Sequence, residues 1–311
     1  MQPVKDLLSR ESKEEVGIFL ATIADSIDET INFGTHIFEW FEESVAGKGD
    51  EAAPIAMSFK HLLEMLDSVS VLVRNSIIEP TKSQLRSALE AAMAIAWILQ
   101  EDSECRAMAF MVWNVHEELK WYQRLDEQTL QGKEFKQKLK GTSVENVQSP
   151  PSVKLKKARK SLETLLTEPK YRVAEEEYQK LRGQRIKNPS WYRLFDGPQN
   201  IEQLAARVEM TEWYELLYRQ WSGVVHATDL LAGKVKFSEG KTYIQKMRCP
   251  DDAETVYTFT ISIALKIYEY ILKCFIPSKV QVFVDWYASE VRDLYMKISS
   301  ENSVLVRSPL S

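Results

Sequence analysis

The 311-residue chain has few of the residues that build disulfide frameworks or metal sites. Its three cysteines, Cys105, Cys249 and Cys274, form no CxxC pair, and none of its four histidines has a second histidine one helical turn away. This pattern excludes a disulfide scaffold and a zinc site encoded by local spacing. We therefore expect a cytoplasmic protein that binds no metal.

The chain also lacks the motifs of several enzyme classes and a continuous apolar run. It contains no Gly-rich phosphate loop, no GxSxG elbow and no kinase motifs, and we expect no cofactor. The N-terminal residues show no uninterrupted apolar core of the kind found in signal peptides. The most apolar segment, 256–276, is broken by Lys266 and Glu269, which predicts a buried helix and no membrane partner.

Charge is unevenly distributed along the sequence. The net charge of −5 argues against a general nucleic-acid binder. Residues 133–187, however, contain fifteen Lys and Arg against seven Glu. This segment is either a solvated helical insertion or a basic surface directed at a phosphate backbone.

Apolar residues recur with a spacing near 3.6 almost throughout, which predicts an all-α fold, a helical bundle. Short β-branched alternations are nearly absent, and residues 235–252 are predicted as a loop or a short hairpin. The first helix is expected to be either extended or kinked at Gly34 toward Phe41. The predicted helices cover approximately residues 15–41, 55–77, 80–100, 103–125, 154–167, 171–183, 200–208, 214–234, 252–274 and 279–299.

We predict a single all-helical domain, 1–311, that contains a basic insertion or linker segment, 130–187. Pro150 and Pro151 lie among small polar residues without periodicity, as is typical of a loop. The apolar content of the insertion is too low to predict a core of its own.

The segment 214–234 carries an unusual polar face if it forms an α-helix. At about 100° per residue, five polar side chains fall within roughly a quarter turn, and mainly apolar residues occupy the opposite half. These five are Tyr218, Asp229, Ser222, His226 and Arg219. An ordinary surface helix would present Lys and Glu there, whereas this set forms hydrogen bonds and can move protons.

A second polar pair interrupts the predicted helix 80–100, which is otherwise mostly apolar. Arg86 and Glu90 are four residues apart and therefore lie on one face. They either form a buried pair that fixes helix packing or orient another polar group, such as the one around His226. The remaining histidines, His36, His61 and His116, are isolated in sequence and are predicted to be partly exposed.

Arg219 and His226 have the chemistry of metal-independent RNA cleavage. A spacing of seven residues places them on one side of a helix, about 10 Å apart along its axis. Imidazole can accept the proton of a 2′-hydroxyl, and guanidinium can stabilise charge on the phosphate. No metal is needed, because the nucleophile belongs to the substrate.

This Arg-x6-His pair resembles the R-x(4–6)-H signature of HEPN-domain ribonucleases. That family consists of α-helical, usually dimeric proteins of toxin–antitoxin and antiphage defence systems. The resemblance implies that Arg219 holds the phosphate and that His226 is the acid or base. It also implies an RNA substrate, a homodimer and an antitoxin or defence-system partner.

A second resemblance extends over residues 15–275. The patterns R-S-x-x-E-A at 86–91 and Y-x3-S-x3-H at Tyr218, Ser222 and His226 are similar to those of an uncharacterised bacterial helical family that is often considered HEPN-like. It implies a helical bundle but no settled activity. The alternative to a nuclease is therefore a non-catalytic binding or regulatory module, in which these residues form a structural or ligand-recognising network.

Overall fold

The computed structural model describes residues 3–4, 7–10, 13–46, 52–145, 151–184, 186, 188–223, 235–238 and 241–301. The described residues are helical nearly throughout, which confirms the all-α class. The more specific HEPN-like relationship stays a prediction.

The chain divides into two compact units. The first comprises Met1–Leu99 and Ala205–Ser311, and the second comprises Gln100–Leu204. The segment 130–187 falls inside the second unit, which begins earlier in the chain. The single-domain organisation and the role of the insertion stay predictions.

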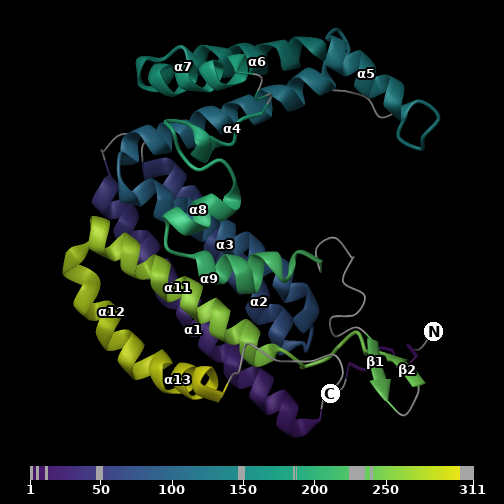
Figure 1. Ribbon diagram of the computed structural model, residues 1–311, viewed down its shortest axis with the longest axis vertical. Helices are drawn as coiled ribbons and strands as arrows, with labels where there is room; N and C mark the ends of the chain where they lie inside the picture. The colour runs from purple at the N-terminus through teal and green to yellow at the C-terminus, as the bar shows by residue number, and fades with distance from the viewer. Residues whose placement is uncertain are drawn as a thin grey trace. The chain divides into compact units, whose positions relative to one another are not determined.

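Long amphipathic helices form the core of the first unit (Figure 1). They are α1 (Glu14–Val45), α2 (Ala53–Arg74), α3 (Ile78–Gln100) and α11 (Ala253–Phe275). α1 packs against α2 and α11, and their inward faces bury Ile27, Phe59 and Tyr268 completely. α1 continues through Gly34, so the extended alternative for this helix was correct.

Shorter elements complete the first unit. A hairpin pairs β1 (Val235–Ser238) with β2 (Lys241–Ile244) in antiparallel register, so the hairpin alternative for this segment was correct. The remaining elements are α9 (Thr211–Trp213), the π-helix η3 (Tyr214–Arg219), the 3-10 turn η4 (Pro277–Lys279), α12 (Val280–Trp286), the π-helix η5 (Tyr287–Val291) and α13 (Arg292–Glu301). The boundary between the units falls within α8 (Ile201–Arg207).

Buried tyrosines on α11 link this helix to α1 through hydrogen bonds. The Tyr257 hydroxyl lies 2.9 Å from Ser26 Oγ, and the Tyr268 hydroxyl donates to the Thr30 carbonyl oxygen at 2.8 Å. Burial raises the pKa of Tyr257 to about 12, although the hydrogen bond from Ser26 acts in the opposite direction. Burial also raises the pKa of Tyr268.

We expect the folded protein to lose stability between about pH 10 and pH 12. In the unfolded chain Tyr257 ionises near pH 10, whereas in the folded chain it stays protonated until about pH 12. The stabilisation is thus fully present below pH 10 and is lost as the pH rises through the folded pKa. Urea denaturation at pH 9 and pH 11.5 should show a smaller alkaline loss for Tyr257→Phe than for the wild type. Equal losses would contradict this assignment.

The second unit is built on α4 (Ser103–Leu125), which packs against two later helices, α6 (Ser152–Leu166) and α7 (Pro169–Gly183) (Figure 1). α5 (Leu130–Leu139) and the 3-10 turn η2 (Trp191–Arg193) also contact α4. The sequence predicted α6 and α7 but not α5. α7 buries Tyr171, Ala174 and Tyr178, so this charged segment still contributes to a small core.

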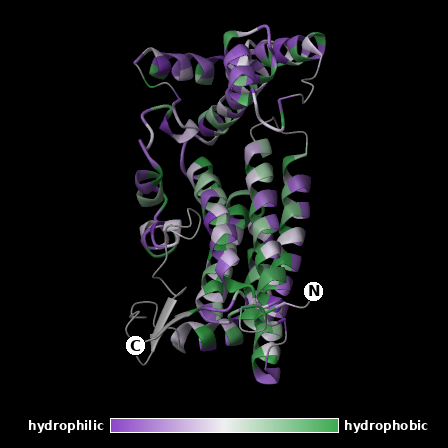
Figure 2. Cartoon of the chain, turned by 90° about the vertical axis from the view of Figure 1, so that its right-hand side faces the viewer, coloured by the Kyte–Doolittle hydropathy of each residue, from purple (hydrophilic) through white to green (hydrophobic). Residues whose placement is uncertain are grey.

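Hydropathy differs between the units. Figure 2 shows apolar residues concentrated on the helices of the first unit, while the helices of the second unit carry many hydrophilic residues. No helix in the described part of the chain has the length and apolarity needed to cross a bilayer.

Candidate functional site

Three ionised side chains lie at one-turn intervals on α3, a helix that is otherwise mostly apolar. They are Lys82, Arg86 and Glu90, and the run 91–98 that follows them is entirely buried. Because residues four apart share a helix face, these side chains form one polar stripe. Lys82 and Arg86 have 8% and 16% of their side-chain surface exposed, so both cations need partners within the protein.

Arg86 packs on the ring of Tyr218. Its guanidinium carbon lies 3.9 Å from the ring centroid, a cation–π contact between α3 and η3. Arg86 Nε is 3.9 Å from Glu90 Oε1, at the outer limit of an ion pair. A buried Arg86–Glu90 pair, one of the two alternatives predicted from the sequence, was wrong for Glu90, because half of its side chain is exposed. Arg86 Nη1 is buried and has no hydrogen-bond partner among the described residues.

The stack continues from Tyr218 to a second ring and a second cation. Tyr218 stacks on Tyr214 with centroids 5.3 Å apart, and the Arg219 guanidinium carbon lies 5.4 Å from the Tyr214 centroid. Arg219 also pairs with Glu215 at 3.3 Å. We call Arg86, Tyr218, Tyr214 and Arg219 the Arg–Tyr cluster. The cluster thus alternates guanidinium groups and aromatic rings in one continuous stack, which joins α3 to η3.

Tyr218 is a hydrogen-bond donor in this environment. Burial raises the pKa of its phenol, the hydrogen bond with Arg86 opposes this effect, and the charge of Glu90 together with a hydrogen bond to Glu90 adds to it. The phenol therefore remains protonated at neutral pH. It can donate to a substrate oxygen, but it is a poor choice for a general base.

The backbone of the 214–234 segment differs from the predicted regular α-helix. Residues 214–219 are π-helical, and a turn follows at 220–221. A rotation of about 100° per residue therefore does not apply before Trp221. Ser222 is half-buried immediately after the turn. His226 and Asp229 lie outside the described residues, so their positions relative to Arg219 stay predictions.

Lys82 belongs to the same arrangement but was not identified in the sequence. Its Nζ lies 2.8 Å from Glu79 and 3.1 Å from Asp252, and 5.7 Å from the centroid of the Trp221 ring. Burial alone would lower the pKa of Lys82, but the two carboxylates outweigh it and raise the pKa. The sequence feature that could have identified Lys82 is its position one helical turn before Arg86, which places the two side chains on the same helix face.

His61 was also not identified in the sequence, because no second histidine lies one helical turn away. Its Nε2 lies 2.9 Å from Ser87 Oγ, the serine of the R-S-x-x-E-A pattern. His61 is exposed on α2. The hydrogen bond therefore places His61 beside the turn of α3 that carries Arg86.

The structure thus brings together Arg86, Glu90 and Tyr218, which come from the two separated halves of the sequence pattern. It does not show a contact between Arg219 and Arg86; Arg219 instead pairs along its own helix. In the described part of the chain, no group of three or more His, Cys, Asp or Glu side chains is placed to hold a metal ion.

A protein-family model matches part of the chain. A model described as a family of unknown function (DUF5677) matches residues 52–241, which include α3 and η3. Comparisons with curated proteins and with solved structures found no match.

Proposed function

The chain belongs to this family of unknown function, and we propose that it acts as a metal-independent RNA endonuclease. The observation that carries the proposal is the packing of Arg86 on Tyr218, 3.9 Å from guanidinium carbon to ring centroid. This contact joins a residue of the R-S-x-x-E-A pattern to a residue of the Y-x3-S-x3-H pattern. It anchors the segment that carries Arg219 and leads into His226.

The proposed reaction is an intramolecular transesterification of RNA. His226 accepts the proton of a 2′-hydroxyl, and the 2′-oxygen forms a bond to phosphorus. The bond from phosphorus to the 5′-oxygen breaks, and that oxygen takes up a proton, which leaves a 2′,3′-cyclic phosphate. Arg219 stabilises the negative charge on the phosphate oxygens. In this scheme the phenol of Tyr218 donates a hydrogen bond to the substrate.

Two further features support an RNA substrate. The Arg–Tyr cluster ends in the guanidinium of Arg219, whose side chain is 54% exposed and can bind a phosphate. The segment 133–187 supplies an excess of positive charge for contacts to the phosphate backbone. The resemblance to HEPN ribonucleases further suggests a homodimeric toxin or antiphage-defence effector that is controlled by a protein partner.

The test is incubation of the full chain with labelled single-stranded RNA in the presence of EDTA. We expect cleavage that resists the chelator and yields products ending in a 2′,3′-cyclic phosphate. A DNA oligonucleotide of the same sequence should remain intact, because it lacks the 2′-hydroxyl. Absence of RNA cleavage, or equal cleavage of the DNA, would contradict the proposed reaction.

One observation favours a second candidate, a non-catalytic binding or regulatory module. Arg86 is mostly buried and Arg219 already has Glu215 as a partner, as expected for a network that fixes helix packing. For such a module we expect the RNA to remain uncut, and His226→Ala to lower the melting temperature.

A further inference from the structure

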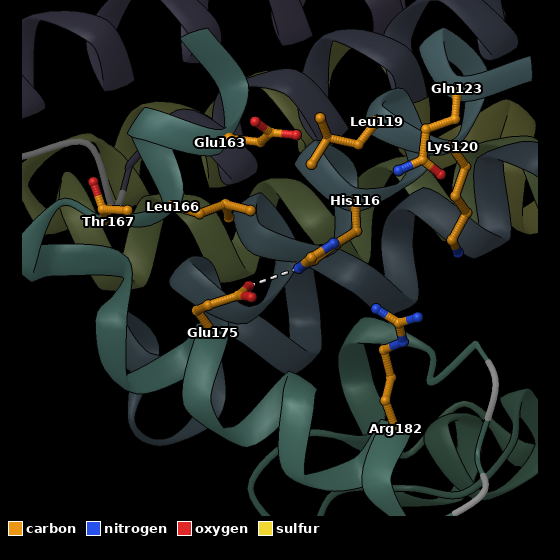
Figure 3. Close-up of a pocket in the computed structure, with 9 residues that line it drawn as sticks. All are labelled: His116, Leu119, Lys120, Gln123, Glu163, Leu166, Thr167, Glu175 and Arg182. Atoms are coloured by element: carbon orange, nitrogen blue, oxygen red, sulfur yellow. Dashed lines mark hydrogen bonds and ion pairs between the residues drawn. The ribbon is translucent and has the colours of Figure 1, made fainter. Parts of the chain in front are cut away.

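The second unit contains a cavity that is separate from the Arg–Tyr cluster. It has a volume of about 380 Å³ and lies between α4, α6 and α7 (Figure 3). Its lining includes His116, Leu119 and Lys120 from α4, Leu166 from α6, and Glu175 and Arg182 from α7. A volume in this range suits a small organic molecule and is too small for a polynucleotide.

One wall of the cavity is a fixed imidazole. His116 Nε2 lies 2.6 Å from Glu175 Oε2, and the imidazole stacks on the ring of Tyr178 at 4.0 Å between centroids. His116 was predicted to be partly exposed, which was wrong, because only 11% of its side chain is accessible. The Gln179 amide also donates to Glu175 at 2.6 Å. Both carboxylate oxygens of Glu175 therefore have a hydrogen-bond partner within the second unit.

Lys120 and Arg182, the two cations among the lining residues, differ in their ion pairs. Glu163, another lining residue, lies 3.6 Å from Arg159, and Lys120 is 2.5 Å from Glu117. Arg182 makes no ion pair within the described part of the chain, and its guanidinium points into the same cavity as the Lys120 ammonium group (Figure 3). A guanidinium can bind two oxygens of one anion at once, and an adjacent ammonium can bind a third.

Apolar side chains line another part of the cavity. Leu119 and Leu166 project into the cavity on the side away from Arg182 (Figure 3). An anion held by Arg182 would therefore place any organic part attached to it against these two side chains and the imidazole of His116. Burial of that part would add a hydrophobic contribution to binding.

We propose that this cavity binds a small phosphate monoester, with its phosphate on Arg182 and Lys120 and its organic part against Leu119 and Leu166. Three donor directions from two cations fit the several oxygens of a phosphate better than the two of a carboxylate. This site is independent of the proposed RNA cleavage, since it shares no residue with the Arg–Tyr cluster.

Calorimetric titration of the full chain with adenosine monophosphate tests the proposal. We expect Arg182→Gln to weaken binding by at least about tenfold, because a charge-assisted hydrogen bond is lost. The matched control is Arg172→Gln on the same helix, where the side chain is 71% exposed, pairs with Glu176 and does not line the cavity. The control should bind like the wild type. No binding to the wild type, or equal weakening in both variants, would overturn the proposal.

Two probes separate the contributions of the phosphate and of the organic part. Adenosine should bind far more weakly than the monophosphate, and inorganic phosphate should also bind more weakly. Equal binding of adenosine would overturn the role of Arg182, and equal binding of phosphate would overturn the role of the leucines. Lys120→Gln gives a second measurement that does not depend on the folding of the Arg182 variant, and it too should weaken binding.

Discussion

His226→Ala is expected to cleave RNA about 10²–10⁴-fold more slowly than the wild type in a buffer that contains EDTA. General acid–base catalysis by a positioned side chain contributes about this factor, and alanine can neither accept nor donate the proton. The rate is measured under single-turnover conditions, so that substrate binding does not limit it. Arg219→Ala should lower the rate by about 10²–10³-fold through loss of charge stabilisation.

His36→Ala is the matched control for this experiment. His36 is an exposed histidine on α1, and its replacement removes the same group without touching the Arg–Tyr cluster. It should cleave RNA at the wild-type rate. If His226→Ala also cleaves at that rate while the melting temperatures of all three proteins agree, His226 has no role in catalysis and the proposed mechanism is wrong.

Gly34→Ala is expected to destabilise the first unit by about 3 kcal/mol, at the upper end of the usual cost of overpacking a core. A Cβ at position 34 would overlap the hydroxyl of Tyr268 and a methyl group of Leu63. Tyr268 is completely buried and donates to the Thr30 carbonyl oxygen at 2.8 Å, so moving it also disrupts a buried hydrogen bond. Urea denaturation followed by circular dichroism measures the change.

Two variants define this effect. Gly183→Ala is the control, because a Cβ there meets no atom within 4 Å, and we expect no loss of stability. The double variant Gly34→Ala with Tyr268→Phe removes the overlapping oxygen and should regain part of the loss relative to Tyr268→Phe alone. If Gly34→Ala loses no more stability than Gly183→Ala, the close packing of α1 against α11 is contradicted.

The helical class and most helix positions could be predicted from the sequence, because each depends on local periodicity. The predicted helix 103–125 coincides with α4, and the predicted helix 252–274 differs from α11 by one residue at each end. Apolar spacing near 3.6 reports which face of a helix is buried, whatever covers it. The π-helical turn at 214–219 was not predicted, because side-chain spacing does not reveal a change in backbone hydrogen bonding.

The sequence alone determined that the chain is a helical protein, and it marked Arg86, Glu90 and Tyr218 as polar groups in apolar surroundings. Only the tertiary structure placed Arg86 on Tyr218 and His61 on Ser87, because contacts between residues distant in the chain depend on how whole helices pack. The burial of His116 was hidden for the same reason. Periodicity describes one helix at a time, whereas Glu175, the partner of His116, lies on another helix, 59 residues later.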